Sequence, residues 1–231
     1  MNNEEIYKDG HYFEKNQSWH VEDSPWKARQ VLKILEKNSI VPASVCEVGC
    51  GAGEILFQLS KHLQKTEFHG YEISPQAFEL TEARKTERVH FHLKDFLNEP
   101  VFYDVVMAID VIEHVEDYFS FLRALKEKGR YKIFHIPLDL SVQTVLRSNP
   151  ILAGRKQVGH IHYFTKETAL ATLKDLNYEV VDYFYTAGMV ELPGKALKSK
   201  ILNIPRRFMF KLNKDLTARI LGGYSLLILA K

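Results

Sequence analysis

Short apolar runs rich in valine, isoleucine and aromatic residues alternate along the chain with longer stretches of helical period. This alternation predicts a mostly parallel β-sheet whose strands are joined by crossover helices. Since a sheet of this kind can take a last antiparallel strand, at its edge or inserted, we expect seven strands in one layer with helices on both faces. The predicted strands are Ser44–Val48, Glu67–Glu72, Val89–Leu93, Tyr103–Ile109, Tyr131–Ile136, Glu179–Tyr185 and Tyr224–Ala230.

Helical periodicity and capping residues place the connecting helices. Ser74 before Pro75 fits an N-cap followed by proline at the first helical position, and Thr165 fits an N-cap with Thr168 in the place of the usual capping-box acid. The predicted helices are Pro25–Lys37, Glu54–Gln64, Gln76–Thr86, Asp117–Lys128 and Lys166–Leu176.

The strand pattern predicts a single domain over residues 1–231 with two additions, an N-terminal helical extension at 1–43 and a helical insert at 188–223. Apolar residues in the insert recur at steps of three and four, which indicates an amphipathic helix bent near Pro205. The insert is strongly basic. It is either a lid packed on the sheet with a solvated basic face, or a patch for an anionic substrate, a partner or peripheral membrane contact through 195–219.

Composition excludes several classes of protein. Apolar residues make up 45% of the chain and charged residues 26%, as in ordinary globular proteins, so disorder and coiled coil are not expected. The net charge of +2 does not favour nucleic acid as a partner. We see neither a secretory signal nor a spanning segment, and Cys46 and Cys50 lack the neighbours of a zinc site, so we expect a cytoplasmic protein with two buried cysteines.

The strongest local signal is the segment Val45–Glu54, in which Glu47 lies on the first strand and Gly49, Gly51 and Gly53 open the next helix. Glycines allow the sharp turn from strand to helix and let a ligand lie directly on the backbone. The dinucleotide fingerprint G-x-G-x-x-G would need a glycine at position 54. Glu54 would instead repel a pyrophosphate, so a nicotinamide dinucleotide is not expected.

The four residues Glu47, Gly49, Gly51 and Gly53 resemble the first motif, E/D-x-G-x-G-x-G, of the class I S-adenosylmethionine-dependent methyltransferases. The resemblance implies a Rossmann-like fold, S-adenosyl-L-methionine as cofactor and S-adenosyl-L-homocysteine as product. It also implies that the loop meets the methionine and ribose parts of the cofactor.

Three further segments extend the resemblance. Glu72 matches the acid that binds both ribose hydroxyls, Asp95 and Phe96 match the adenine contact, and Tyr103–Val115 resembles the D-V-V-x-x-x-x-V-L-E-H-V segment. Glu72 also fits a surface acid, and Asp95 a loop residue that caps the next turn. The predicted cofactor-binding residues are Glu47, Gly49, Cys50, Gly51, Gly53, Glu72, Ile73, Asp95, Phe96, Asp110 and Val111.

Methyl transfer from a sulfonium is an in-line displacement, in which the protein aligns the acceptor and removes its proton where necessary. Imidazole is the natural base for a hydroxyl acceptor at neutral pH. The predicted catalytic residues are His114, His160 and His162, with His160 preferred, and an extended segment would put His160 and His162 on one side. The alternative for each is a hydrogen bond that shapes the loop.

Asp110, Glu113 and His114 resemble the E-x-x-E-H run of quinone-biosynthesis O-methyltransferases, where the resemblance implies that a divalent metal orients the acceptor. Asp110 reaches less far than glutamate, and a Glu-His pair also forms helix-start hydrogen bonds. We therefore expect no metal ion.

The acceptor pocket is expected to involve residues before 40, residues 138–165 and residues 188–223. Tyr12, Trp19 and His20 are the predicted substrate contacts, although simple packing on the sheet would also explain these aromatic residues.

We expect an enzyme that methylates a small molecule or glycan precursor, at oxygen. The alternatives are a regulatory or non-catalytic subunit that binds S-adenosylmethionine, and a nucleic-acid methyltransferase in which the basic insert follows the phosphate backbone.

Overall fold

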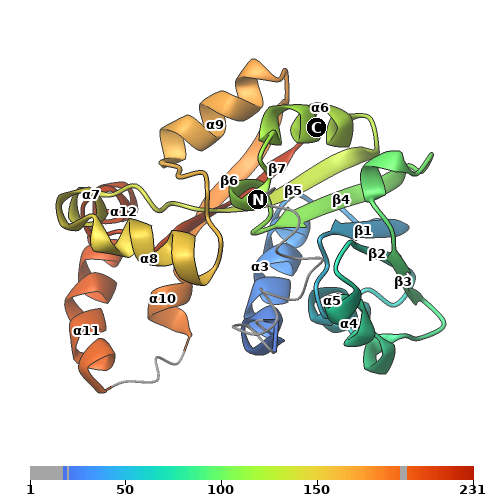
Figure 1. Cartoon of the computed structure of the whole chain (residues 1–231), viewed down its shortest axis with the longest axis horizontal. Helices are drawn as coiled ribbons and strands as arrows, with labels where there is room; N and C mark the ends of the chain where they lie inside the picture. Colours follow the sequence, from blue (N-terminus) through green and yellow to red (C-terminus); the bar gives the residue numbers. More distant parts are fainter. Residues whose placement is uncertain (1–17, 20, 193–196) are drawn as a thin grey trace.

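The structure is a computed structural model that describes residues 18–19, 21–192 and 197–231, with side chains undescribed at 197–204. Seven strands form one sheet in the order β3-β2-β1-β4-β5-β7-β6 (Figure 1). The strands β1 to β5 pair in parallel, and β7 pairs antiparallel with both β5 and β6. The strands are β1 Ser44–Val48, β2 Glu67–Glu72, β3 Val89–Leu93, β4 Tyr103–Ile109, β5 Gly129–Pro137, β6 Val180–Thr186 and β7 Ser225–Ala230.

The predicted α/β fold class is confirmed, and the bounds of β1 to β4 match the predicted ones. Residues on β4 alternate between the two faces of the sheet, with Val105 and Met107 in one hydrophobic core and Val106 and Ala108 in the other. Because both faces are buried, the strand is apolar without interruption from Val105 to Ile109. The last strand, β7, lies between β5 and β6, so it is an inserted strand rather than an edge.

Helices cover both faces of the sheet. The helices α3 Ser24–Lys37 and α4 Glu54–Ser60 contribute to one core, and α6 Tyr118–Lys126 and α9 Lys166–Asp175 contribute to the other. The hydroxyl of Thr165 accepts a hydrogen bond from the backbone N–H of Thr168, as the predicted capping box requires.

Two helices are shorter than predicted. The helix α4 ends at Ser60 rather than Gln64, because the guanidinium of Arg88 donates hydrogen bonds to the carbonyls of Ser60, Leu63 and Thr66 and holds them out of a helical ladder. The segment predicted as one helix at Gln76–Thr86 divides into α5 Pro75–Glu79, with Ser74 as its N-cap, and the short 3₁₀ helix η2 Glu82–Arg84. The other 3₁₀ helices are η1 Val21–Asp23, η3 Phe96–Asn98 and η4 Ile112–His114.

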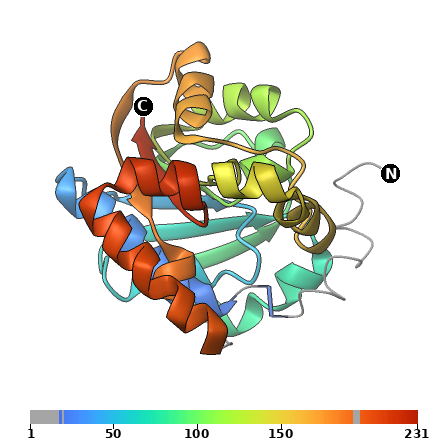
Figure 2. The ribbon, with the colours of Figure 1, turned by 90° about the vertical axis from the view of Figure 1, so that its left-hand side faces the viewer.

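A group of helices at one end of the sheet brings residues 138–165 together with the insert (Figure 2). Arg206 joins the two parts, since its guanidinium donates to the side-chain oxygen of Gln143 at 2.9 Å and to the carbonyls of Leu221 and Gly222 at 3.0 and 2.9 Å. The helices of this group are α7 Val142–Arg147, α8 Asn149–Gln157, α10 Gly188–Glu191, α11 Leu197–Leu212 and α12 Lys214–Leu221.

The sequence did not predict α7 and α8, nor the break in the insert at Asn213, while the bend near Pro205 stays a prediction. The helix α11 continues through Pro205, and the insert breaks at Asn213, whose side chain accepts from the backbone N–H of Leu216 and caps α12. Pro205 lacks a backbone N–H and so removes one hydrogen bond from α11, but the residues on both sides of it are helical.

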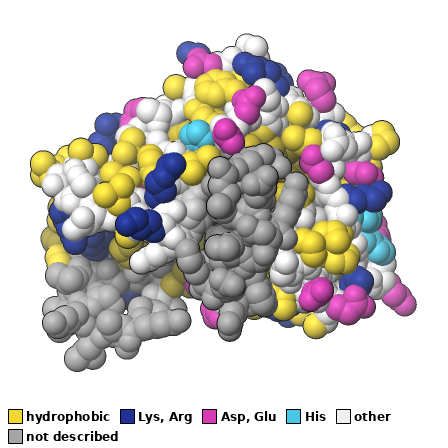
Figure 3. All heavy atoms as spheres, viewed as in Figure 1, with side chains coloured by type: hydrophobic (Ala, Val, Ile, Leu, Met, Phe, Trp, Pro, Cys, Tyr) yellow, Lys and Arg dark blue, Asp and Glu magenta, His cyan; other side chains and the backbone are white. Residues whose placement is uncertain are grey.

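The outer surface of this helical group carries large apolar side chains among basic ones (Figure 3). Leu146 is 80% exposed and Leu212 is 71% exposed. Part of the basic charge is neutralised inside the group, because Arg219 pairs with Asp215 and Glu167. Peripheral membrane contact through 195–219 stays a prediction. None of the helices in the described part of the chain has the length and apolar character needed to cross a membrane.

We predict that Gly53→Ala destabilises the fold. Gly53 has a φ of 76°, and a Cβ there would lie 2.3 Å from the ring of Phe91. The strained backbone and the overlap should lower the free energy of unfolding by about 1–3 kcal/mol in urea titrations. The control is Gly154→Ala in α8, where the nearest atom to a new Cβ is 4.0 Å away. That change should be neutral or stabilise by up to about 1 kcal/mol, so equal losses in both variants would contradict the prediction.

Candidate functional site

A cavity of about 710 Å³ opens at the carboxyl ends of β1, β4 and β5. All three segments expected to shape the acceptor pocket contribute to its wall: Trp19 and Lys27 from the N-terminal part, Val158 and His160 from the middle part, and Met189 and Arg206 from the insert. The glycine loop forms another part of the wall. The cavity therefore joins the predicted cofactor loop to the predicted acceptor segments.

The glycine loop is held in place by Glu72. One oxygen of its buried carboxylate accepts from the backbone N–H of Gly51 at 2.8 Å, and the other accepts from those of Ile73 and Ser74, each at 2.8 Å. Gly51 has a φ of 55°, and a Cβ on it would lie 2.4 Å from the indole of Trp19. The Trp19 indole therefore packs directly on the Gly51 backbone, an approach that a side chain at position 51 would block.

Glu47 lies at the base of the cavity with its carboxyl group buried. Its Oε2 atom has no hydrogen-bond partner among the residues described. Burial raises the pKa of Glu47 to about 8, although the nearby ammonium of Lys27 opposes the shift. The carboxyl group is thus largely neutral at pH 7, because the Lys27 ammonium, which is paired with Asp110, does not offset the effect of burial on the pKa of Glu47.

Asp110 follows β4 and is bound on both carboxylate oxygens. Its Oδ2 lies 2.7 Å from Nζ of Lys27, and its Oδ1 lies 2.5 Å from Nδ1 of His135, whose Nε2 is 2.8 Å from the hydroxyl of Thr186. Burial alone would raise the pKa of Asp110, but His135 and Lys27 outweigh it and hold this pKa well below its ordinary value. Asp110 is therefore part of an internal ion pair that also lines the cavity, and its contact with the cofactor stays a prediction.

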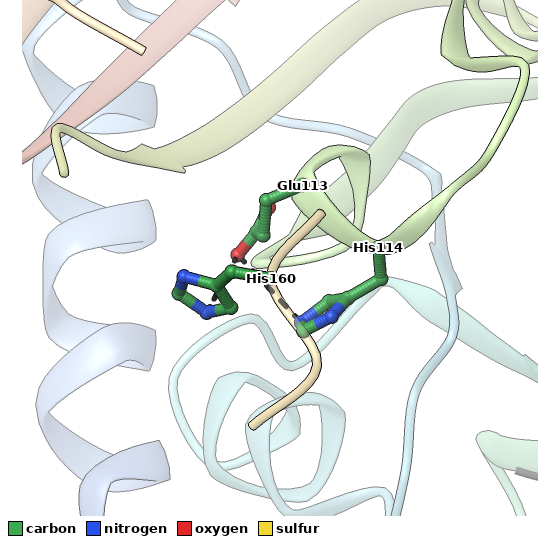
Figure 4. Close-up of side chains that lie close together, drawn as sticks. All are labelled: Glu113, His114 and His160. Atoms are coloured by element: carbon green, nitrogen blue, oxygen red, sulfur yellow. Dashed lines mark ion pairs between the residues drawn. The ribbon is translucent and has the colours of Figure 1, made fainter. Parts of the chain in front are cut away.

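Glu113, His114 and His160 converge on one point of the cavity wall (Figure 4). The Nε2 atoms of His114 and His160 each lie 3.9 Å from Oε1 of Glu113. Glu113 is fully buried, and neither of its carboxyl oxygens has a hydrogen-bond partner in the described structure. Burial, followed by the Asp110 carboxylate, raises the pKa of Glu113 well above its usual value. Burial and then the imidazole of His160 lower the pKa of His114 to about 4.

The second nitrogen of each imidazole in this cluster has a partner. Nδ1 of His160 lies 2.7 Å from Oδ2 of Asp139, and Nδ1 of His114 lies 3.1 Å from the carbonyl oxygen of Gly159. These contacts fix both ring orientations, so the Nε2 atoms face Glu113.

The two histidines of the Gly-His-x-His segment do not face the same site, contrary to the expectation from alternation. Nε2 of His162 lies 2.9 Å from the carbonyl of Val115 and 3.2 Å from that of Glu116. His162 therefore ties this segment to the residues after η4, which is the loop-shaping alternative, while His160 alone lines the cavity.

Of the remaining predicted residues, Cys50 lines the cavity, Asp95 and Phe96 do not, and two fall outside the described residues. The exposed carboxylate of Asp95 caps η3 by accepting from the backbone N–H of Leu97 at 2.9 Å. Phe96 is buried in the core beside Tyr71. Cys46 and Cys50 are buried free thiols, as predicted. Tyr12 and His20 fall outside the described residues.

Sequence reasoning missed Lys27, His135 and Asp139, which partner the predicted residues. Lys27 lay in a predicted helix as one charge among many, and Asp139 lay in a segment without a motif. His135 carried a usable signal, since it is a polar residue near the carboxyl end of an otherwise apolar strand.

Comparisons with known proteins agree with this geometry. No curated protein matches the sequence. A SAM-dependent methyltransferase from Archaeoglobus fulgidus is similar with a TM-score of 0.63 and 18% identity over 95% of this chain and 99% of that one. Magnesium protoporphyrin IX methyltransferase from Synechocystis with bound SAH gives 0.59 and 16% over 89% and 82%. The plantazolicin methyltransferase gives 0.55 and 17% over 96% and 87%.

A family model described as "Methyltransferase domain" matches residues 20–183, which is more than half of the chain. The match confirms the predicted enzyme class and, with it, S-adenosylmethionine as the cofactor, whereas nothing supports the quinone-biosynthesis branch in particular. The protein belongs to the methyltransferase domain family.

Proposed function

We propose that this protein transfers the methyl group of S-adenosylmethionine to a hydroxyl oxygen of a small molecule or glycan precursor. The observation that carries the proposal is that one cavity is lined both by the glycine loop and by the Glu113, His114 and His160 cluster. Two structurally similar proteins are a protoporphyrin and a plantazolicin methyltransferase, which favours a small-molecule acceptor.

The residues present fit the cofactor. S-adenosylmethionine supplies a methyl group already activated on a sulfonium, together with an ammonium, a carboxylate and two ribose hydroxyls. The unpartnered Glu47 oxygen is suited to the ammonium, and Gly49 and Gly51 of the glycine loop line the same cavity. Glu72 accepts three backbone hydrogen bonds, and two carboxylate oxygens offer about four acceptor sites, so one remains for the ribose.

Among the predicted bases, His160 has the geometry that the role requires. Asp139 holds its Nδ1, which leaves Nε2 at the cavity wall to receive a proton from an acceptor hydroxyl. A base held by a carboxylate keeps one tautomer and one orientation. His162 does not offer this arrangement, since its Nε2 lies against backbone carbonyls.

The alternative is a subunit that binds the cofactor without chemistry. Conversion of S-adenosylmethionine to S-adenosylhomocysteine in the presence of a fractionated metabolite pool tests the choice directly. Turnover that depends on one fraction supports the enzyme, and tight cofactor binding without turnover in any fraction supports the binding subunit. Methylation of RNA or DNA in parallel samples would favour the nucleic-acid alternative.

We predict that the affinity for S-adenosylhomocysteine rises with pH between 6 and 8. The pKa of Glu47 is about 8 in the free protein, and an ammonium partner favours the ionised form. Binding therefore releases a proton below pH 8, and the affinity should increase by up to about tenfold per pH unit and then level off. Isothermal titration calorimetry measures the profile, and Glu47→Gln should make it flat. A flat profile in the unmodified protein would contradict this role of Glu47.

We further predict that His160→Ala lowers kcat by about 10²- to 10⁴-fold, the usual contribution of a positioned base. The affinity for S-adenosylhomocysteine, measured by calorimetry, should stay unchanged, because His160 lies on the acceptor side. His62→Ala, at an exposed position after α4, is the control and should keep both values. Normal turnover in His160→Ala would remove His160 from catalysis.

A further inference from the structure

The cluster of Glu113, His114 and His160 contains the kinds of side chain that bind a cation. A fully buried carboxyl group with two unpartnered oxygens faces two imidazole nitrogens, and the three ligand atoms lie within 4.8 Å of one another. Burial of an unpaired carboxyl costs free energy that a bound cation would recover. Lys27, the nearby ammonium, is bound to Asp110 rather than to Glu113.

The hydrogen bonds behind the two imidazoles determine which nitrogen can bind a cation. The carbonyl oxygen of Gly159 can only accept, so Nδ1 of His114 carries the hydrogen and its Nε2 carries the lone pair. The carboxylate of Asp139 selects the same tautomer of His160. Both lone pairs therefore lie on the nitrogens that face Glu113, as in metal centres where the outer nitrogen of each histidine is bound by a carbonyl or carboxylate.

We propose that Glu113, His114 and His160 bind a divalent transition-metal ion, with Zn²⁺ as the best match to two imidazoles and one carboxylate. Ligands about 2.1 Å from a tetrahedral ion lie about 3.4 Å apart. The two Nε2–Oε1 separations of 3.9 Å exceed this spacing by about 0.5 Å, and all three ligand atoms lie within 4.8 Å of one another, so small side-chain rotations would bring them to bonding distance. Asp110 is not a fourth ligand, because Lys27 and His135 hold both of its oxygens.

Three protein ligands leave a fourth position open, and the cluster lines the cavity, so the open position faces the acceptor. This role of the site rests on the proposed function, although metal binding itself does not. A cation at this site would lower the pKa of an acceptor hydroxyl bound at the open position, so that the hydroxyl would lose its proton to solvent more readily. The acceptor oxygen then bonds to the methyl carbon, and the carbon–sulfur bond breaks with its electron pair left on sulfur. With the ion bound, His160 is a ligand and the acceptor proton passes to solvent, so His160 serves as the base of the proposed function only in the metal-free protein. The substrate class is a compound with a metal-binding hydroxyl.

The site can be tested by titrating Co²⁺ into chelator-treated full-length protein and recording the visible absorption spectrum. We expect one equivalent of Co²⁺ to give the intense bands of a four- or five-coordinate site without a thiolate charge-transfer band, and Zn²⁺ to displace it. Glu113→Gln and His160→Ala should each weaken Co²⁺ binding by at least about 100-fold, and Asp139→Asn by about 10- to 100-fold. His62→Ala is the control for adventitious imidazole binding and should titrate like the unmodified protein.

Calorimetry with S-adenosylhomocysteine on the same samples shows whether each variant is folded, since none of the changes touches the glycine loop. Absence of a Co²⁺ spectrum in the folded unmodified protein, or equal Co²⁺ affinity in the Glu113 and His160 variants, would overturn the metal site and leave the proposed methyl transfer standing. One equivalent of Co²⁺ bound through these residues confirms the site even where no metabolite fraction is methylated, and in that case the proposed function fails alone.

Discussion

The central constraint on this molecule is the cost of placing carboxyl groups in buried space where the parallel strands end. Glu47, Glu72, Asp110 and Glu113 all lie at this edge, and Glu47, Glu72 and Glu113 are buried. Water does not solvate these three, so each needs hydrogen bonds, a cation or a proton. The way each acid meets that need separates the parts of the site that are complete from those that require a ligand.

Two of the acids are satisfied by the protein itself. Glu72 takes backbone N–H groups and so shapes the glycine loop, while Asp110 takes Lys27 and His135 and so ties α3 and β5 to the end of β4. Glu47 and Glu113 retain unpartnered oxygens within the described chain. They lie on the two functional sides of one cavity, which is why the cofactor and the metal ion are assigned to them.

The sequence predicts those elements of the fold that depend on neighbouring residues, and it misses those that depend on contacts with distant residues. The bounds of β1 to β4 were predicted correctly because each strand carries a local pattern: β4 is apolar from Val105 to Ile109, as a strand buried on both faces must be, whereas β3 alternates apolar residues with histidine. The helix α7 escaped prediction because Val145 and Leu146 are exposed, so its apolar residues do not mark a buried face. The early end of α4 coincides with the hydrogen bond from Arg88 to the carbonyl of Ser60. Arg88 precedes β3 and reaches α4 only because β3 pairs with β2, which is a long-range contact.

The same distinction between local and long-range contacts separates the site residues that were predicted from those that were not. Motif spacing located Glu47, Glu113 and His114, since these follow strands whose ends must meet at one edge. It did not reveal that His160 joins them while His162 turns away, because alternation in an extended segment treats the two alike. The difference comes from long-range contacts: Asp139 fixes His160 toward Glu113, and the carbonyls of Val115 and Glu116 hold His162. The backbone N–H groups of Ile161 and His162 also bind the carbonyl of Glu113, so the residue that lacks side-chain partners is the one whose backbone positions the histidine segment.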